Sequence, residues 1–576
     1  MSGLDWAVLF GALAGFVLYG LWRSRGMRDL DSFLVAGRRM PWPMVALSVM
    51  ATQASAITFL STPGQGFADG MRFVQFYFGL PLAMIVLCMI AVPAYHRMKV
   101  FTAYEYLQSR FDGKTRTLAA GLFLVQRGLA AGLTIYAPAL VLSVILGWDV
   151  RWTCVLLGGL VVVYTAAGGS QAVGHTHFVQ FLIIMSTMVV AFAVVFSALP
   201  AGVSAGDAFA LAGQLGKLNA LEVRFDPNDR YNLWSGLIGG FFLQMSYFGT
   251  DQSQVGRYLT GHSVTESRLG LLFNGLVKVP MQLFILGLGV LVAVFYLFAP
   301  PPLWFDRVTV AGVMEGPHAR EFSRLEADHR RVLTEREHHA RAFLEARRAG
   351  DREERVRAET ALDDAQQRLS GLRATAVELL RRDDPAARTN DVNYVFLTFV
   401  LTHLPVGLVG LVFAAVFAAA MNSTSAELNA LTSTTVVDVV QRAWPRRGDG
   451  RHEVLISRLV TVAWAVFAVA FAEFAAGLGS LVEAVNILGS LFYGTILGIF
   501  LTAFLLKRVG GNAVFMAALL AETTVIVLFF TTDIGYLWYN LIGCGMVLGL
   551  GMILESILPG RRNASRDPVP SVPGRG

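Results

Sequence analysis

Charge is scarce in this sequence. Lys, Arg, Asp and Glu make up 15% of its 576 residues and hydrophobic residues 55%, with a mean hydropathy of +0.54. Soluble proteins average about 25% charged residues. Such a chain could not cover its apolar surface in water, which excludes a water-soluble enzyme. The net charge of +6 therefore indicates orientation in a lipid bilayer rather than nucleic-acid binding.

Cysteine and catalytic motifs are scarce as well. The three cysteines lie far apart in apolar runs, so neither a disulfide framework nor a metal cluster is indicated. The sequence has no Walker-type phosphate loop, and ATP-driven pumping therefore lacks its machinery. We predict that the protein is not an enzyme, and no obligatory protein partner is evident.

Long apolar runs are what the sequence has instead. A bilayer core takes about 20 apolar helical residues to cross, and about thirteen runs qualify. They are 5–22, 42–63, 73–95, 118–146, 150–167, 176–199, 232–250, 269–298, 405–441, 454–476, 480–507, 512–532 and 536–557. The first run carries Asp5 and ends at Trp22-Arg23, so we interpret it as a retained span and not a signal peptide.

Basic residues predict the orientation of these spans. Arg and Lys gather after the first, third and ninth runs and in the tail, whereas the alternate loops hold few. The positive-inside rule then predicts a multi-pass protein of the cell (plasma or inner) membrane, with the N-terminus outside and the C-terminus in the cytoplasm.

The span order indicates a duplicated transporter core. Without the first and the last two spans, ten remain, and copies of five must start on opposite sides of the membrane. Polar or small residues interrupt the first member of each half, at 52–56 and at Gly239-Gly240 with Gln244 and Ser246. The fold prediction is all-α integral membrane, with a 5+5 inverted repeat. The predicted parts are 1–40 (extra helix and cytoplasmic loop), 41–200 (first repeat), 201–231 (external loop), 232–304 and 394–508 (second repeat), 305–393 (insert), 509–558 (two C-terminal helices) and 559–576 (disordered cytoplasmic tail).

The insert at 305–393 has a different composition. It holds about 35 of the charged residues, and its later part has apolar residues spaced alternately four and three apart, as in a coiled coil. This stripe consists of Ala358, Leu362, Ala365, Leu369, Leu372, Ala376 and Leu379. With a turn at Ala349-Gly350-Asp351, the pattern predicts an external helical hairpin. It is either a solvated loop or a stalk that binds a partner.

Five strings resemble the sodium:solute symporter family. They are GRRMPW leading into ATQASAITFLS, YEYLQSRFDGKTRT (104–117), YTAAGGSQAV (164–173), FGTDQSQVGRYLTG (248–261) and AAAMNSTSAELNALTSTTVVD (418–438). The resemblance covers nearly all of 5–557 except the insert. It implies the ten-helix inverted-repeat core, alternating access, and solute uptake driven by the sodium gradient.

Hydroxyl and amide groups concentrate at 421–435, and such neutral oxygens suit a small hard cation; the alternative is that the hydroxyls bond to their own helix. The resemblance implies a Na⁺ site at Ala51, Ala54, Ala419, Asn422 and Ser423. The chain departs from the family in having Asn422 beside Ser423, where paired hydroxyls are common. It also has His177 where the family has an aspartate, which raises proton coupling as an alternative to a packing role.

The solute pocket is expected between the two interrupted helices. The candidates are Thr58, Gln75, Tyr77, Gln244 and Tyr247, and Lys278 is the one cation expected near that depth. We predict a sodium-coupled symporter that moves a small polar solute into the cell. The alternatives are a proton-coupled symporter that uses His177 and a membrane sensor with a transporter-like core.

Overall fold

The computed structural model describes residues 1–23, 38–384, 389–443, 450–477 and 480–557, and these residues are largely helical. The tail predicted to be disordered, 559–576, lies outside them. The first half contains α1 (Gly3–Arg23), α3 (Trp42–Gln53), α4 (Ala56–Asp69), η2 (Gly70–Tyr77), α5 (Leu80–Met89), α6 (Ala91–Met98), α7 (Ala103–Arg110), α8 (Gly113–Leu146), α9 (Val150–Ser197) and α10 (Ala205–Gln214).

The second half begins with η3 (Ser235–Gly239), α11 (Gly240–Gly249), α12 (Gln252–Tyr258) and α13 (Val264–Phe298). Next come α14 (Arg307–Glu315), α15 (Ala319–Ala349), α16 (Arg352–Asp383) and α17 (Val392–His403). The chain continues through α18 (Leu408–Thr434), η4 (Thr435–Val440), α19 (Gln441–Ala443), α20 (Gly450–Ala472), η5 (Glu473–Gly477), α21 (Leu481–Leu505), α22 (Gly511–Thr531) and α23 (Leu537–Ile557).

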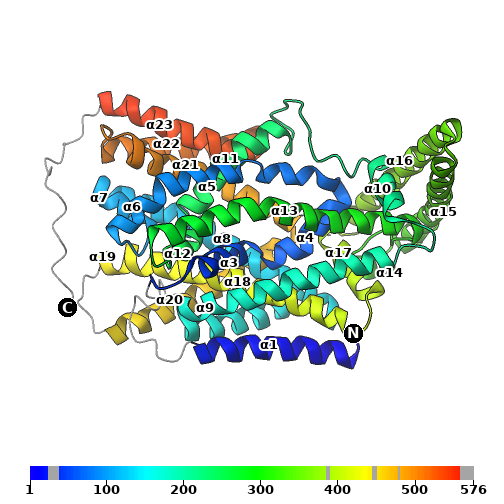
Figure 1. Cartoon of the computed structure of the whole chain (residues 1–576), viewed down its shortest axis with the longest axis horizontal. Helices are drawn as coiled ribbons and strands as arrows, with labels where there is room; N and C mark the ends of the chain where they lie inside the picture. Colours follow the sequence, from blue (N-terminus) through cyan, green and yellow to red (C-terminus); the bar gives the residue numbers. More distant parts are fainter. Residues whose placement is uncertain (24–37, 385–388, 444–449, 478–479, 558–576) are drawn as a thin grey trace.

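Nine stretches of the described residues are long and apolar enough to cross a membrane, and they run along one common direction (Figure 1). The predicted spans 150–167 and 176–199 both lie along the single helix α9, which ends two residues before the second span does. The apolar parts of this helix are Val150–Val162 and His177–Ser197. The N-terminus and the hairpin of α15 and α16 lie at one end of the bundle. The end of α23 lies at the other (Figure 1).

The first core helix is broken where the sequence predicts it. Helix α3 ends at Gln53, Ala54 leaves the helix, and Ser55 is the extended N-cap residue of α4. The first main-chain bond of α4 is accepted by Ser55, and the last of α3 by Met50. The carbonyl groups between these two positions are therefore released from helical hydrogen bonding, as in a discontinuous membrane helix.

The second break lies farther along than predicted. Gly239 and Gly240 sit within helical turns, whereas the chain leaves the helix at Thr250 and Asp251, between α11 and α12. A side chain at Gly239 or Gly240 would clash with the carbonyls of Leu537 and Phe76, at 2.7 Å each. The glycines thus serve close helix packing, which is why they did not mark the break.

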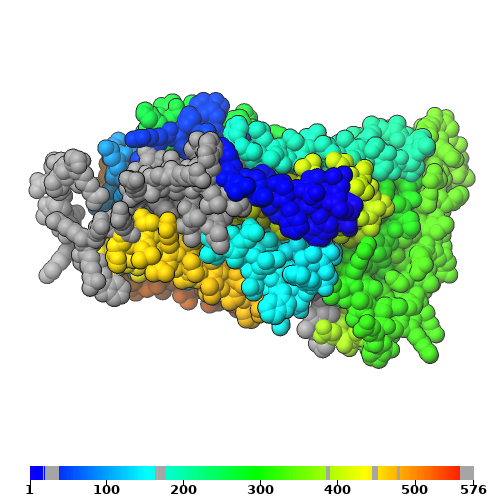
Figure 2. Space-filling view, turned by 90° about the horizontal axis from the view of Figure 1, so that it is seen from below, coloured from blue at the N-terminus to red at the C-terminus, as the bar shows by residue number. Residues whose placement is uncertain are grey.

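The insert forms the predicted hairpin. Helices α15 and α16 pack against each other, and Gly350 ends α15 in the left-handed region at φ +72°. Six of the seven apolar stripe residues are buried and Leu372 is partly buried. Figure 2 shows the hairpin as a green block across one end of the molecule.

Arginines attach the hairpin to the helices beneath it. Arg348 and Arg347 bind both oxygens of Asp207 in α10, at 2.6 and 3.3 Å. Burial opposes ionisation of Asp207, but hydrogen bonds from Arg348 and Ser204 outweigh it and lower its pKa to about 2. Arg336 donates to the carbonyl of Tyr296 at the end of α13, at 2.7 Å. These contacts hold the hairpin against the bundle.

Candidate functional site

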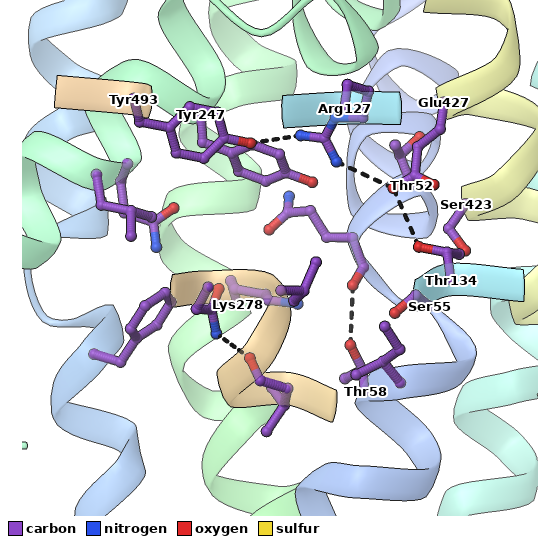
Figure 3. A pocket seen from close by; sticks show the side chains of 18 of the residues that line it. Thr52, Ser55, Thr58, Arg127, Thr134, Tyr247, Lys278, Ser423, Glu427 and Tyr493 are labelled. Carbon is purple, nitrogen blue, oxygen red and sulfur yellow. Dashed lines mark hydrogen bonds and ion pairs between the residues drawn. The ribbon is translucent and has the colours of Figure 1, made fainter. Parts of the chain in front are cut away.

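A cavity of about 100 Å³ lies beside the break in the first core helix (Figure 3). Its walls come from α3, α4, η2, α8, α11, α13, α18 and α21. Its lining residues are Thr52, Gln53, Ser55, Ile57, Thr58, Phe76, Tyr77, Gln126, Arg127, Thr134, Leu243, Gln244, Tyr247, Lys278, Ser423, Glu427, Val482, Val485, Asn486 and Tyr493. Most of these residues carry a polar group that can hydrogen-bond a small polar solute, although much of the cavity surface is apolar.

Four of the five predicted pocket residues line this cavity: Thr58, Tyr77, Gln244 and Tyr247. Gln75 does not. Its amide donates to the carbonyl of Tyr231 at 2.9 Å and accepts from the backbone N–H of Glu222 at 3.1 Å. Because both ends of the amide are engaged, Gln75 holds the 222–231 loop and is not part of the cavity lining.

The residues expected around sodium come from two helices that meet at the break. Helix α18 packs against both α3 and α4. Ala51, Ala54 and Ala419 are fully buried. The carbonyls of Ala51 and Ala54 accept no main-chain hydrogen bond from the described residues. A buried carbonyl without a partner is costly, and a cation could satisfy two of them here.

Asn422 and Ser423 differ in their hydrogen bonding. The Oδ1 and Nδ2 atoms of Asn422 are buried and have no partner among the described residues. The hydroxyl of Ser423 donates to the carbonyl of Ala419 at 2.9 Å, which is the alternative anticipated for this helix. Donation leaves the hydroxyl oxygen lone pairs available, so both side chains present oxygen acceptors near the break.

A buried charge network at the cavity was not anticipated. Arg127 of α8 pairs with Asp251, and its Nη1 lies 3.1 Å from Oε1 of Glu427 in α18. The hydroxyl of Tyr493 in α21 donates to Oδ2 of Asp251 at 2.8 Å and accepts from Nη2 of Arg127 at 2.5 Å. The prediction that Lys278 is the one cation at this depth was therefore wrong. Charges within apolar runs were the available signal, but their pairing was not visible in the sequence.

His177 is buried beside the break. Its Nδ1 lies 3.3 Å from the hydroxyl of Ser48 in α3, and the main chain of Asn422 lies against its ring. This position fits a residue that packs between α3 and α18. Asn486 of α21 lines the cavity, whereas Glu483 in the first turn of the same helix binds Arg230 and the hydroxyl of Tyr231.

A sequence model of the sodium:solute symporter family matches residues 33–312 and 373–521. The chain belongs to this family. Its coupling ion is sodium, and it is a multi-pass membrane transporter and not an enzyme. The gap between the matched segments contains α15 and much of α16, so most of the hairpin lies outside the part of the chain that the family model matches.

The chain resembles individual transporters at modest identity. It is 23% identical to the sodium/sialic acid symporter SiaT of Proteus mirabilis, over 98% of this chain and 97% of that protein. It is 33% identical to human sodium-coupled monocarboxylate transporter 1, over 47% of this chain and 44% of that one. A solved substrate-bound, outward-open Na⁺-coupled sialic acid symporter superposes with a TM-score of 0.74 at 21% identity, covering 96% of this chain and 98% of the other. This last likeness shows the shared fold.

Proposed function

We propose that the protein takes up a small polar solute through the central cavity, with Na⁺ bound between the break of the first core helix and α18. The observation that carries this proposal is that both of the elements that pack together here, the break and α18, carry buried oxygens without hydrogen-bond partners among the described residues. In the part of the chain that the structure describes, the carbonyls of Ala51 and Ala54 have no main-chain partner and Asn422 Oδ1 has no partner. Ser423 and the carbonyl of Ala419 complete the proposed set.

Sodium in this position would bridge two elements that must move apart during transport. A ligand shifts a conformational equilibrium only by binding one state more tightly than another. We propose that Na⁺ stabilises the outward-open state by holding α3 and α18 together, and that the solute then binds in the adjacent cavity. Ser423 lines that cavity, so it connects the ion site with the solute site.

The orientation of the chain across the membrane is part of the same proposal. The N-terminus and the hairpin lie at one end of the bundle and the end of α23 lies at the other (Figure 1). With the positive-inside assignment, the hairpin end faces outward and transport runs toward the α23 end.

The test compares thermal unfolding of the purified protein in NaCl and in KCl at equal ionic strength and fixed pH. We expect sodium to raise the unfolding temperature, because a ligand of the folded state stabilises it by mass action. Asn422→Ala and Ser423→Ala should weaken the sodium response at least tenfold. Ser433→Ala is the matched control, since its hydroxyl bonds its own helix in the same way, 3.0 Å from the Ala430 carbonyl.

Counterflow in proteoliposomes completes the test. Exchange of solute that requires Na⁺ at constant pH supports the proposal. Exchange that requires a proton gradient and not Na⁺ would instead favour coupling through His177.

A further inference from the structure

Lys278 is a buried cation that has no counterion among the described residues. It projects from the middle of α13, its side chain is among the most deeply buried of the large residues, and it lines the central cavity. Its ammonium nitrogen lies 5.7 Å from the centre of the Tyr77 ring. No carboxylate of the described residues lies within ion-pair distance of it.

The other charges at the cavity are already paired. The guanidinium of Arg127 is held between Asp251 and Glu427, so its positive charge is already balanced by two carboxylates. Figure 3 shows Lys278 on the opposite side of the cavity from Glu427. A lysine inside a membrane is costly unless it finds a partner, and Lys278 lines a cavity in which a solute could supply that partner.

We propose that the transported solute carries a carboxylate group that pairs with the ammonium of Lys278. This inference rests on the proposed function and names the chemical class of its solute. Gln53, Gln244 and Asn486 line the same cavity and supply hydrogen bonds for the uncharged part. The unpartnered Oε2 of Glu427 disfavours a second negative charge at the far side, so the solute is a monoanion.

The first measurement needs no solute. If Lys278 has no carboxylate partner in the solute-free protein, then Lys278→Met removes a buried charge that no counterion balances. We expect its unfolding temperature without solute to equal or exceed that of the unaltered protein. A clear decrease would show that Lys278 holds a structural ion pair and would overturn the proposal.

The second measurement uses matched probes in NaCl: pyruvate, lactate and N-acetylneuraminate against lactamide, N-acetylneuraminate methyl ester and glucose. We expect at least one carboxylate, and no neutral probe, to raise the unfolding temperature. Lys278→Met should abolish this shift, whereas Lys278→Arg should keep part of it because the positive charge remains. Lys507→Met, an exposed position beyond α21, should leave it unchanged.

Other outcomes separate the two proposals. A neutral probe that stabilises as well as its carboxylate partner overturns the inference, as does the absence of any response to the carboxylates or an undiminished response in Lys278→Met. If a neutral probe stabilises the protein only with sodium, then sodium-coupled transport stands and the solute class is wrong. If sodium has no effect on stability or on counterflow with any probe, the proposed function itself fails.

Discussion

The central network and the hairpin both rely on arginine and carboxylate pairs, yet the pairs differ in kind. Arg127, Asp251 and Glu427 are buried where helices α8, α12 and α18 meet. Most hairpin pairs are exposed and link neighbouring turns of one helix, such as Arg331 with Asp328 at 3.1 Å. Removing one member of a buried pair leaves an uncompensated charge, whereas exposed pairs contribute little. In this protein, the loss of stability on removing a charged side chain should therefore depend on whether its pair is buried, and not on how many partners it has.

The largest expected effect comes from Arg127→Met. The substitution leaves the carboxylates of Asp251 and Glu427 buried without their cation, so we expect a loss of about 3–5 kcal/mol of stability and a loss of transport. Unfolding in detergent and sodium-dependent uptake would measure the two. Adding Asp251→Asn and Glu427→Gln should restore part of the stability, because the unpaired charges disappear. A single variant as stable as the unaltered protein would contradict the buried network.

The second effect concerns pH and His329 in α15. Burial, with Arg373 and Arg336 nearby, lowers the pKa of His329 to about 4 from 6.5. The unfolded chain therefore binds a proton at a higher pH than the folded one. The contribution of neutral His329 to the free energy of unfolding is fully present above pH 6.5. It decreases as the pH falls toward 4, by about 3 kcal/mol in total.

Hydrogen exchange of the hairpin at pH 7 and pH 4.5 would measure this loss. His329→Leu should flatten the pH dependence, and the exposed His338→Gln is the matched control that should preserve it. An unchanged slope in His329→Leu would show that other groups cause the acid sensitivity.

A smaller effect is expected from Asp207→Asn, which weakens the attachment of the hairpin to α10. Both arginine partners are partly exposed, so we expect a loss of about 1–2 kcal/mol, seen as faster proteolysis of the hairpin. Because hydrogen bonds lower the pKa of Asp207 to about 2, this attachment is complete above about pH 4 and weakens as the pH falls toward 2. Equal proteolysis of variant and parent would argue against a clamp at this position.

The smallest effect is expected from Arg331→Ala. Its pair with Asp328 is exposed to solvent on α15, so the change in stability should stay below about 0.5 kcal/mol. Transport should not change. A loss of stability as large as that of Asp207→Asn would contradict the distinction between hairpin charges that contact α10 and hairpin charges that face solvent.

Local patterns predicted much of the fold. The apolar runs marked most membrane helices, and the four–three spacing from Ala358 to Leu379 marked the buried stripe of the hairpin, because each depends on neighbours along one helix. The polar interruption at 52–56 marked the break of the first core helix. The glycines at 239 and 240 were misleading, because their role is to admit the neighbouring backbones of Phe76 and Leu537.

The sequence by itself determined that this chain is a membrane protein with a discontinuous core helix and a charged helical hairpin, since composition and periodicity are properties of neighbouring residues. Only the tertiary structure decided that Arg127 meets Glu427 across 300 positions and that Gln75 holds a loop. It also decided that Lys278 faces the cavity with no counterion among the described residues. The physical reason is that burial and pairing depend on which helices meet. No local pattern shows whether a charge will find its counterion in the protein or await one from outside.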